Sequence, residues 1–61
     1  MREVTLVEYR AGTAVEVKWK RRWYPAHVLA VQRGIHHIQY DGYDATWNEW
    51  VAGKRIRLLQ G

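Results

Sequence analysis

The sequence of 61 residues has no cysteine, no serine and no phenylalanine, and it has a single proline. Without cysteine, neither a disulfide nor a thiolate zinc site can staple the fold. No nucleophile motif is present either, because hydroxyl side chains other than those of tyrosine come only from Thr5, Thr13 and Thr46. We therefore expect a protein that is not an enzyme and that binds no cofactor.

Long apolar runs are also missing. No stretch approaches the roughly 20 apolar residues that a membrane span needs. Residues 1–8 lack the uncharged apolar block of a signal peptide, and the absence of cysteine fits a reducing compartment. These features predict an intracellular chain with no membrane partner.

The three histidines do not have the spacing of a metal site. His36 and His37 are adjacent in an expected strand, so their side chains point to opposite faces, and His27 stands alone. No His-x-His or His-x-x-x-His pair occurs. We expect no bound metal.

A chain of this length makes one small domain with a marginal core. A single core below about 70–80 residues rarely supplies more than roughly 3–5 kcal/mol. The four tryptophans and four tyrosines must carry much of the burial, because each large aromatic removes roughly 150–250 Å² from water. Some of the rings are therefore expected in the core, and all eight cannot form a binding site.

The alternation of apolar and polar residues predicts five short strands joined by tight turns. Residues 14–20 alternate clearly, and residues 23–33 carry apolar side chains on both faces, which indicates a bulge or strong bend. A third strand is expected at 35–40 and a last one at 55–59. Between them we expect a short strand running into one helical turn. A capping box at Thr46 that opens a short helix is the alternative.

These elements predict an all-β fold, in which one domain spans residues 1–61. Its body is a small, strongly bent five-stranded barrel of about residues 14–59, with one short helical turn before the last strand. Residues 1–13 are expected to form an N-terminal arm or an extra strand, because residues 3–9 alternate only loosely.

Two surfaces of opposite character follow from the uneven charge. Residues 40–51 hold four aromatic rings and three acids with no base, a composition that suits a receptor for a cation but that a hydrophobic core also explains. The net charge of +4 is concentrated elsewhere, above all in the turn at residues 18–22. Nucleic-acid phosphates are one partner for that turn, with contacts from Lys18, Lys20, Arg21 and Arg22 and base stacking on Trp23. A solvated loop is the other interpretation.

Three motifs carry a family resemblance that spans roughly residues 14–58. They are Val15-x-Val17-x-Trp19, then Trp23-Tyr24-Pro25-Ala26-x-Val28, and then the most specific one, Tyr40-Asp41-Gly42-Tyr43-x-x-x-Trp47-x-Glu49-Trp50-Val51, followed by Arg55-Ile56. In these motifs the chain resembles the chromo barrel, or Tudor-knot domain, of the Tudor, chromo and agenet group of SH3-like barrels. The resemblance implies an SH3-like barrel that forms part of a larger protein or complex.

The resemblance also implies an aromatic cage that holds a methylated lysine of a histone-like or other protein tail. The positions that match the cage are Trp19, Tyr24, Tyr40, Tyr43 and Trp47. Trp50 matches a tryptophan that packs into the barrel, and we expect it in the core with Val51. Asp41, Asp44 and Glu49 are candidates for the cage rim, where carboxylates favour the N–H of mono- or dimethyllysine. Alternatively, Asp41 caps its turn and the other two acids are solvated.

Two other functions remain open at this point. The domain is either a nucleic-acid-binding barrel that binds RNA or DNA through residues 18–22, or an SH3-like protein–protein adaptor whose rings are mostly core. As an isolated domain we expect a monomer. The resemblance places it in the nucleus on chromatin in a eukaryote, or in the cytoplasm of a bacterium.

Overall fold

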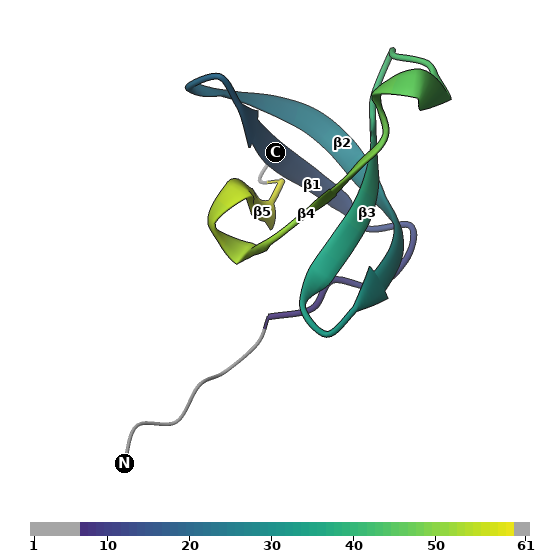
Figure 1. Cartoon of the computed structure of the whole chain (residues 1–61), viewed down its shortest axis with the longest axis vertical. Helices are drawn as coiled ribbons and strands as arrows, with labels where there is room; N and C mark the ends of the chain where they lie inside the picture. Colours follow the sequence, from purple (N-terminus) through teal and green to yellow (C-terminus); the bar gives the residue numbers. More distant parts are fainter. Residues whose placement is uncertain (1–6, 60–61) are drawn as a thin grey trace.

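The computed structural model describes residues 7–59, which form one antiparallel sheet of five strands (Figure 1). The strands are β1 (Ala14–Trp19), β2 (Arg22–Gln32), β3 (Ile35–Tyr40), β4 (Glu49–Val51) and β5 (Ile56–Leu58). Two single 3₁₀ turns complete the fold, η1 (Ala45–Trp47) and η2 (Gly53–Arg55). The sheet order is β4-β3-β2-β1-β5, so the closing strand β5 returns to the first strand. The predicted all-β, SH3-like barrel is confirmed.

Two tight hairpins join the first three strands. Trp19 pairs with Arg22, which leaves Lys20 and Arg21 as a two-residue turn with φ of 49° and 72°. The second hairpin turns at Arg33 and Gly34, with φ of 52° and 80°. Two successive positive φ angles are typical of the type I′ turn, whose twist matches that of paired strands. Glycine and asparagine are the usual residues there, so Lys20 and Arg21 are unusual occupants.

The long strand β2 bends at a bulge, as its sequence predicts. Its register with β3 shifts between Val28 and Ala30. An extra residue at such a point kinks the strand and increases its twist, which lets one strand serve two sides of a small barrel. Residues 22–27 of β2 therefore pair with β1, and its residues from 26 to 32 pair with β3.

The core is small and takes at least one side chain from every strand. Its buried hydrophobic residues are Val15, Val17, Ala26, Val28, Ile38, Tyr40, Val51 and Ile56. They alternate along each strand, so the period of two that predicts the strands also predicts the inner face. Leu58, which the alternation also places inward, is half exposed although it pairs with the buried Val15, because it ends the short edge strand β5.

The predicted position of Trp50 in the core is wrong. Trp50 is 48% exposed and stacks on the His37 ring, with 4.7 Å between centroids and 11° between planes. Strand alternation explains the result: Val51 is buried, so its neighbour must point to the opposite face of β4. Trp50 also pairs with His37 on β3. Because the neighbouring residue, His36, is buried, His37 faces outward and Trp50 lies beside it on the outer surface.

The short segment around β4 differs partly from its prediction. A strand running into a helical turn is present, as β4 and η2. The additional turn η1 precedes the strand, and its N-cap is Asp44, whose side chain accepts from the backbone N–H of Thr46. The capping box at Thr46 is therefore not formed, because the acid two residues earlier already caps the turn.

Residues 7–13 form no strand, although they lie against the barrel. The Tyr9 ring packs on His36 at 5.3 Å between centroids, and the Tyr9 backbone N–H donates to His36 Nε2 at 2.8 Å. Glu8 accepts the Gly34 N–H at 2.8 Å. This part of the predicted arm is held in place, and residues 3–6 of the expected leading strand lie outside the described residues.

The helical content of residues 7–59 is limited to turns of three residues, and none is long and apolar enough to cross a membrane. Within the same range, no three His, Asp or Glu side chains gather closely enough to hold a metal ion.

Replacing Trp50 tests its assignment to the outer surface. Trp50→Ala should fold and lose about 1 kcal/mol, the worth of one stacked aromatic pair. Ile38→Ala, which empties a fully buried site, should cost about 2–5 kcal/mol and leave much of the chain unfolded, because so small a domain has roughly 3–5 kcal/mol in all. Urea titration followed by circular dichroism compares the two variants. Similar losses in both would show that Trp50 belongs to the core.

The buried His36 predicts a loss of stability in mild acid. Burial lowers the pKa of His36 below its ordinary value of 6.5, and the N–H that Tyr9 donates to Nε2 requires the neutral ring. The unfolded chain therefore binds a proton more readily, so stability is complete above about pH 6.5 and falls as the pH drops below it.

The measurement is the free energy of unfolding at several pH values between about 7.5 and 5.5. We expect its slope with pH to be reduced in His36→Gln relative to the unmodified chain, whereas the outward His37→Gln serves as the matched control. An unchanged slope in His36→Gln would assign the acid sensitivity to another group.

Candidate functional site

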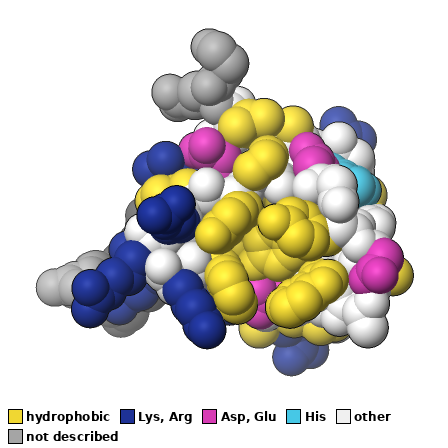
Figure 2. Space-filling view, turned by 90° about the horizontal axis from the view of Figure 1, so that it is seen from above, with side chains coloured by type: hydrophobic (Ala, Val, Ile, Leu, Met, Phe, Trp, Pro, Cys, Tyr) yellow, Lys and Arg dark blue, Asp and Glu magenta, His cyan; other side chains and the backbone are white. Residues whose placement is uncertain are grey.

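An aromatic pocket of about 280 Å³ opens at one end of the barrel. Figure 2 shows this end of the molecule, where hydrophobic side chains gather in one patch with Lys and Arg side chains along one side. The pocket is lined by Trp19, Tyr24, Tyr40, Tyr43, Thr46, Trp47 and Glu49. All five rings that the sequence predicts as cage positions are among them.

The five rings form a closed circuit in which each ring contacts the next at a steep angle. Trp19 meets Tyr24 at 6.1 Å and 66°, and Tyr24 meets Tyr40 at 6.3 Å and 87°. Tyr40 meets Tyr43 at 6.4 Å and 79°, and Tyr43 meets Trp47 at 6.5 Å and 70°. The circuit closes where Trp47 returns to Trp19 at 6.3 Å and 80°. Neighbouring walls of a regular five-sided box meet at about 72°, close to these edge-to-face angles.

Three of the rings extend the rows of core side chains by one more position. Trp19 continues the row of Val15 and Val17 on β1, Tyr24 continues that of Ala26 and Val28 on β2, and Tyr40 continues that of Ile38 on β3. The strand register sets Tyr24 opposite Val17 and Tyr40 opposite Ala26. The site is therefore the end layer of the barrel interior, where bulky rings replace aliphatic side chains.

The other two walls come from the loop between β3 and β4. Tyr43 and Trp47 are 52% and 55% exposed, whereas Tyr40 beneath them is 7% exposed. Asp44 caps η1 by accepting from the backbone N–H and the hydroxyl of Thr46. The Gln39 amide donates to the Tyr43 carbonyl at 3.3 Å. These bonds hold the loop so that its two rings face the strand rings.

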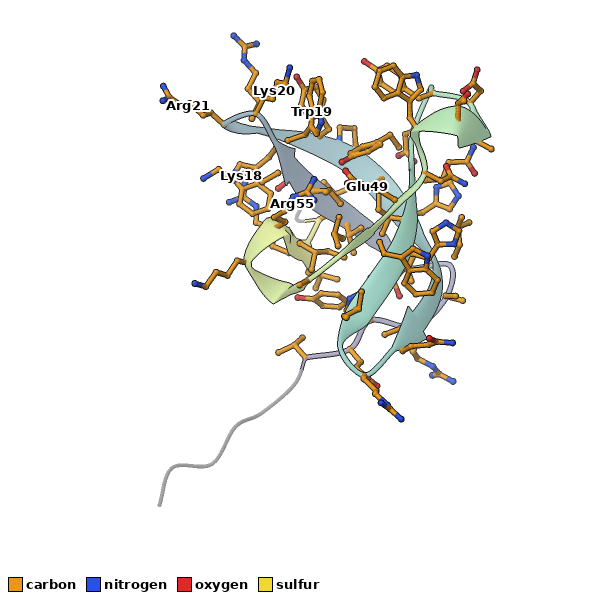
Figure 3. All side chains as sticks on the ribbon, in the orientation of Figure 1. Lys18, Trp19, Lys20, Arg21, Glu49 and Arg55 are labelled. Carbon is orange, nitrogen blue, oxygen red and sulfur yellow. The ribbon has the colours of Figure 1, made fainter. Side chains whose placement is uncertain are left out.

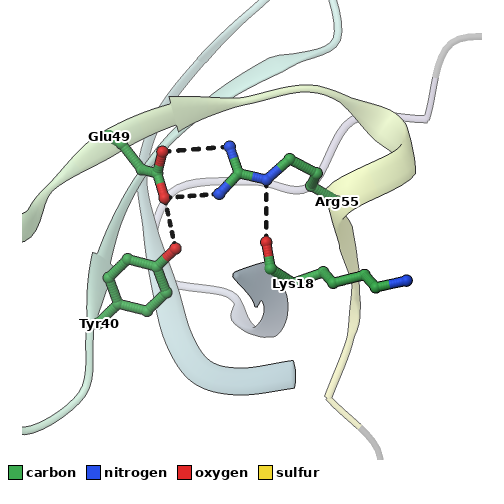
Figure 4. Close-up of polar contacts among 4 residues, drawn as sticks. All are labelled: Lys18, Tyr40, Glu49 and Arg55. Atoms are coloured by element: carbon green, nitrogen blue, oxygen red, sulfur yellow. Dashed lines mark hydrogen bonds and ion pairs between the residues drawn. The ribbon is translucent and has the colours of Figure 1, made fainter. Parts of the chain in front are cut away.

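The floor of the pocket is held by an ion pair. Tyr40 donates its hydroxyl to Glu49 Oε2 at 2.5 Å, and Arg55 donates Nη2 to the same oxygen at 2.7 Å and Nη1 to Oε1 at 3.2 Å (Figure 4). Arg55 Nε donates to the Lys18 carbonyl at 2.9 Å. A bidentate, charge-assisted pair of this kind fixes both partners in orientation.

The same contacts settle the protonation states of the floor. Hydrogen bonding from Arg55 lowers the pKa of Glu49 below its ordinary value, so the carboxylate is ionised at neutral pH. Burial, followed by the hydrogen bond to Glu49, raises the pKa of Tyr40, which keeps the phenol neutral and able to donate. Hydrogen bonding to Glu49 raises the pKa of Arg55.

The three acids that the sequence assigns to the cage rim lie in different places. Only Glu49 lines the pocket. Asp41 Oδ1 lies 3.1 Å from His27 Nδ1, and Asp44 is engaged in capping η1. Asp41 lines no part of the pocket, and its side-chain contact is with His27, not with the backbone of its own turn.

The basic turn lies next to the pocket and does not enter it. Lys20 Nζ is 4.8 Å from the ring centroid of Trp19, a pocket wall (Figure 3). Within residues 7–59, none of the four side chains Lys18, Lys20, Arg21 and Arg22 forms an ion pair with a carboxylate. Trp23, the proposed stacking ring, has one face covered by Arg57, whose Cζ lies 3.9 Å from its centroid.

Two residues of the site follow less directly from the sequence. Thr46 lines the pocket, whereas the sequence indicates it only as the start of a capping box. Arg55 orients the floor through Glu49 and is not among the residues that line the pocket. The sequence motifs do not show which acid Arg55 contacts, because that depends on how β4 and η2 fold together.

Comparison with known proteins supports the group to which the barrel was assigned. A family model described as the agenet domain matches residues 12–60. Searches of curated proteins and of solved structures give no match. The family match covers most of the chain and supports the wider Tudor, chromo and agenet group, not the chromo barrel in particular. With its five-stranded barrel and aromatic end layer, the chain belongs to the agenet domain family.

Proposed function

We propose that the aromatic pocket binds a methylated lysine side chain of another protein. The observation that carries the proposal is the closed circuit of five rings, since a structural core requires no open, ring-lined end. Membership of a family of binding modules supports a non-catalytic role. We also propose that the domain is a chromo barrel, which is a narrower assignment within the same group of barrels.

The size of the ring circuit suits a single alkylated ammonium. The centroids of neighbouring rings are 6.1–6.5 Å apart. A regular pentagon with such sides has its corners about 5.4 Å from the centre, within the roughly 6 Å over which a ring face attracts a cation. A cation among the wall rings would thus lie within reach of several ring faces, with Tyr40 beneath it as the floor.

The affinity of a lysine side chain for such a site depends on its methylation. An unmodified ammonium has three N–H donors that lose water on entry, whereas methyl groups replace donors with apolar surface. Each good cation–π contact is worth roughly 0.5–2 kcal/mol. Because one side chain buries little area, we expect weak binding by the isolated domain, in the upper micromolar range or above.

Trp47→Ala tests the cage without disturbing the core. Trp47 is more than half exposed, so the variant should fold normally, yet it opens one wall of the circuit and should weaken methyl-lysine binding by about tenfold or more. The measurement is a titration of the domain with methyl-lysine peptides, followed by calorimetry or backbone amide shifts.

Trp50→Ala is the matched control, because it removes a similarly exposed tryptophan outside the pocket. It should leave the affinity unchanged. Equal affinities for Trp47→Ala and the unmodified domain would contradict the cage, and so would a lack of response to any methylated peptide at millimolar concentration.

A second candidate function, nucleic-acid binding, is favoured by the strained basic turn. Lys20 and Arg21 both have positive φ, a conformation that costs a residue with a side chain on the order of 1–3 kcal/mol and that persists where function requires it. A turn of Asn-Gly would remove the strain. Keeping two cations there, beside Lys18 and Arg22, favours contacts with phosphate.

The double variant Lys20→Asn with Arg21→Gly separates the charge from the stability of the fold. It should raise the free energy of unfolding by roughly 1 kcal/mol or more while it weakens salt-dependent binding to a single-stranded oligonucleotide. Arg33→Asn with Lys54→Asn is the control, because it removes two charges away from this hairpin. Unchanged oligonucleotide affinity in the first variant, or binding insensitive to salt, would contradict this function.

A further inference from the structure

Among residues 7–59, Glu49 is the one acid that lines the pocket, and its carboxylate is engaged in an ion pair. Asp41 lies with His27, Asp44 caps η1, and neither lines the pocket. Glu49 does line it, but its Oε2 accepts from both Tyr40 and Arg55, and its Oε1 accepts from Arg55. The charge of Glu49 is therefore compensated by a guanidinium at 2.7 Å.

This arrangement affects the methylation states of lysine differently. Mono- and dimethyllysine keep one or two N–H donors, which need an acceptor once water is removed. Thr46 and Tyr43, which also line the pocket, carry neutral hydroxyl groups that can accept a hydrogen bond. Hydrogen bonds of N–H⁺ to a neutral oxygen are weaker than those to a free carboxylate.

Trimethyllysine has no such requirement. Its quaternary nitrogen carries a full charge and no N–H, so every contact that it makes is with a ring face or between apolar groups. Each additional methyl group that is fully buried strengthens binding by about fourfold. The five-ring circuit supplies these ring-face and apolar contacts. It supplies no additional interaction that would strengthen the binding of mono- or dimethyllysine.

We propose that this cage selects trimethyllysine over mono- and dimethyllysine, because Glu49, the one carboxylate that lines it among residues 7–59, is held by Arg55 and Tyr40. The inference rests on the proposed methyl-lysine function and specifies the ligand of the same site. It reverses the expectation that the nearby acids favour the lower methylation states.

The experiment uses four peptides of one sequence that carry an unmodified, mono-, di- or trimethylated lysine. Titrated into the whole chain, they should bind with affinity that rises at each step, and the trimethylated peptide should bind about tenfold or more tightly than the monomethylated one. Monomethyl or dimethyl binding as tight as trimethyl binding would overturn the selectivity and leave the proposed function intact. If none of the four binds, both are overturned.

Placing a free carboxylate in the pocket tests the cause. Thr46 lines the pocket and is exposed, so Thr46→Glu should strengthen monomethyl-lysine binding and lower the trimethyl-to-monomethyl affinity ratio by about threefold or more. Thr46→Gln loses the same hydroxyl and adds a similar volume without charge, and should keep the ratio of the unmodified chain. Equal ratios in the two variants would overturn the assignment of selectivity to the missing free carboxylate.

Discussion

The contact between Arg55 and Glu49 links the closure of the barrel to the geometry of the pocket. One guanidinium donates to both oxygens of Glu49 on β4 and to the backbone carbonyl of Lys18 on β1. Glu49 in turn accepts a hydrogen bond from the hydroxyl of Tyr40, the ring at the floor of the circuit. The edge strand β4, the strand β1 and the base of the site are thus joined through four groups. An isolated surface ion pair contributes little to stability, but this one is bidentate and belongs to a network in which each member orients the next.

A domain of this size must use its aromatic residues for both stability and binding. The core holds few side chains, and most of them are small or β-branched. Tyr40 belongs to both regions, since it is buried among core residues and also forms the floor of the pocket. From this floor upward the rings become more exposed, to Tyr43 and Trp47 at the mouth. The gradient explains how one row of side chains can be a core at one end and a receptor at the other.

The distribution of charge around the pocket defines what it can recognise. The acids on this side of the molecule are engaged with His27, Thr46 and Arg55, whereas the basic turn at residues 18–22 has no carboxylate partner among residues 7–59. A pocket walled by ring faces therefore lies beside a turn of unpaired positive charge.

The sequence by itself determined the barrel and the identity of the five rings. Alternation with period two predicts β1 and its inner face, the apolar residues on both faces of β2 predict its bulge, and the three motifs that carry the family resemblance together supply the five ring positions. Only the tertiary structure decided the order of the rings, the outward direction of Trp50, the engagement of the three acids and the position of Thr46. The physical reason is that a local pattern fixes which side of a strand a residue faces, whereas a contact such as that of Arg55 with the Lys18 carbonyl joins residues far apart in the sequence and exists only in the folded barrel.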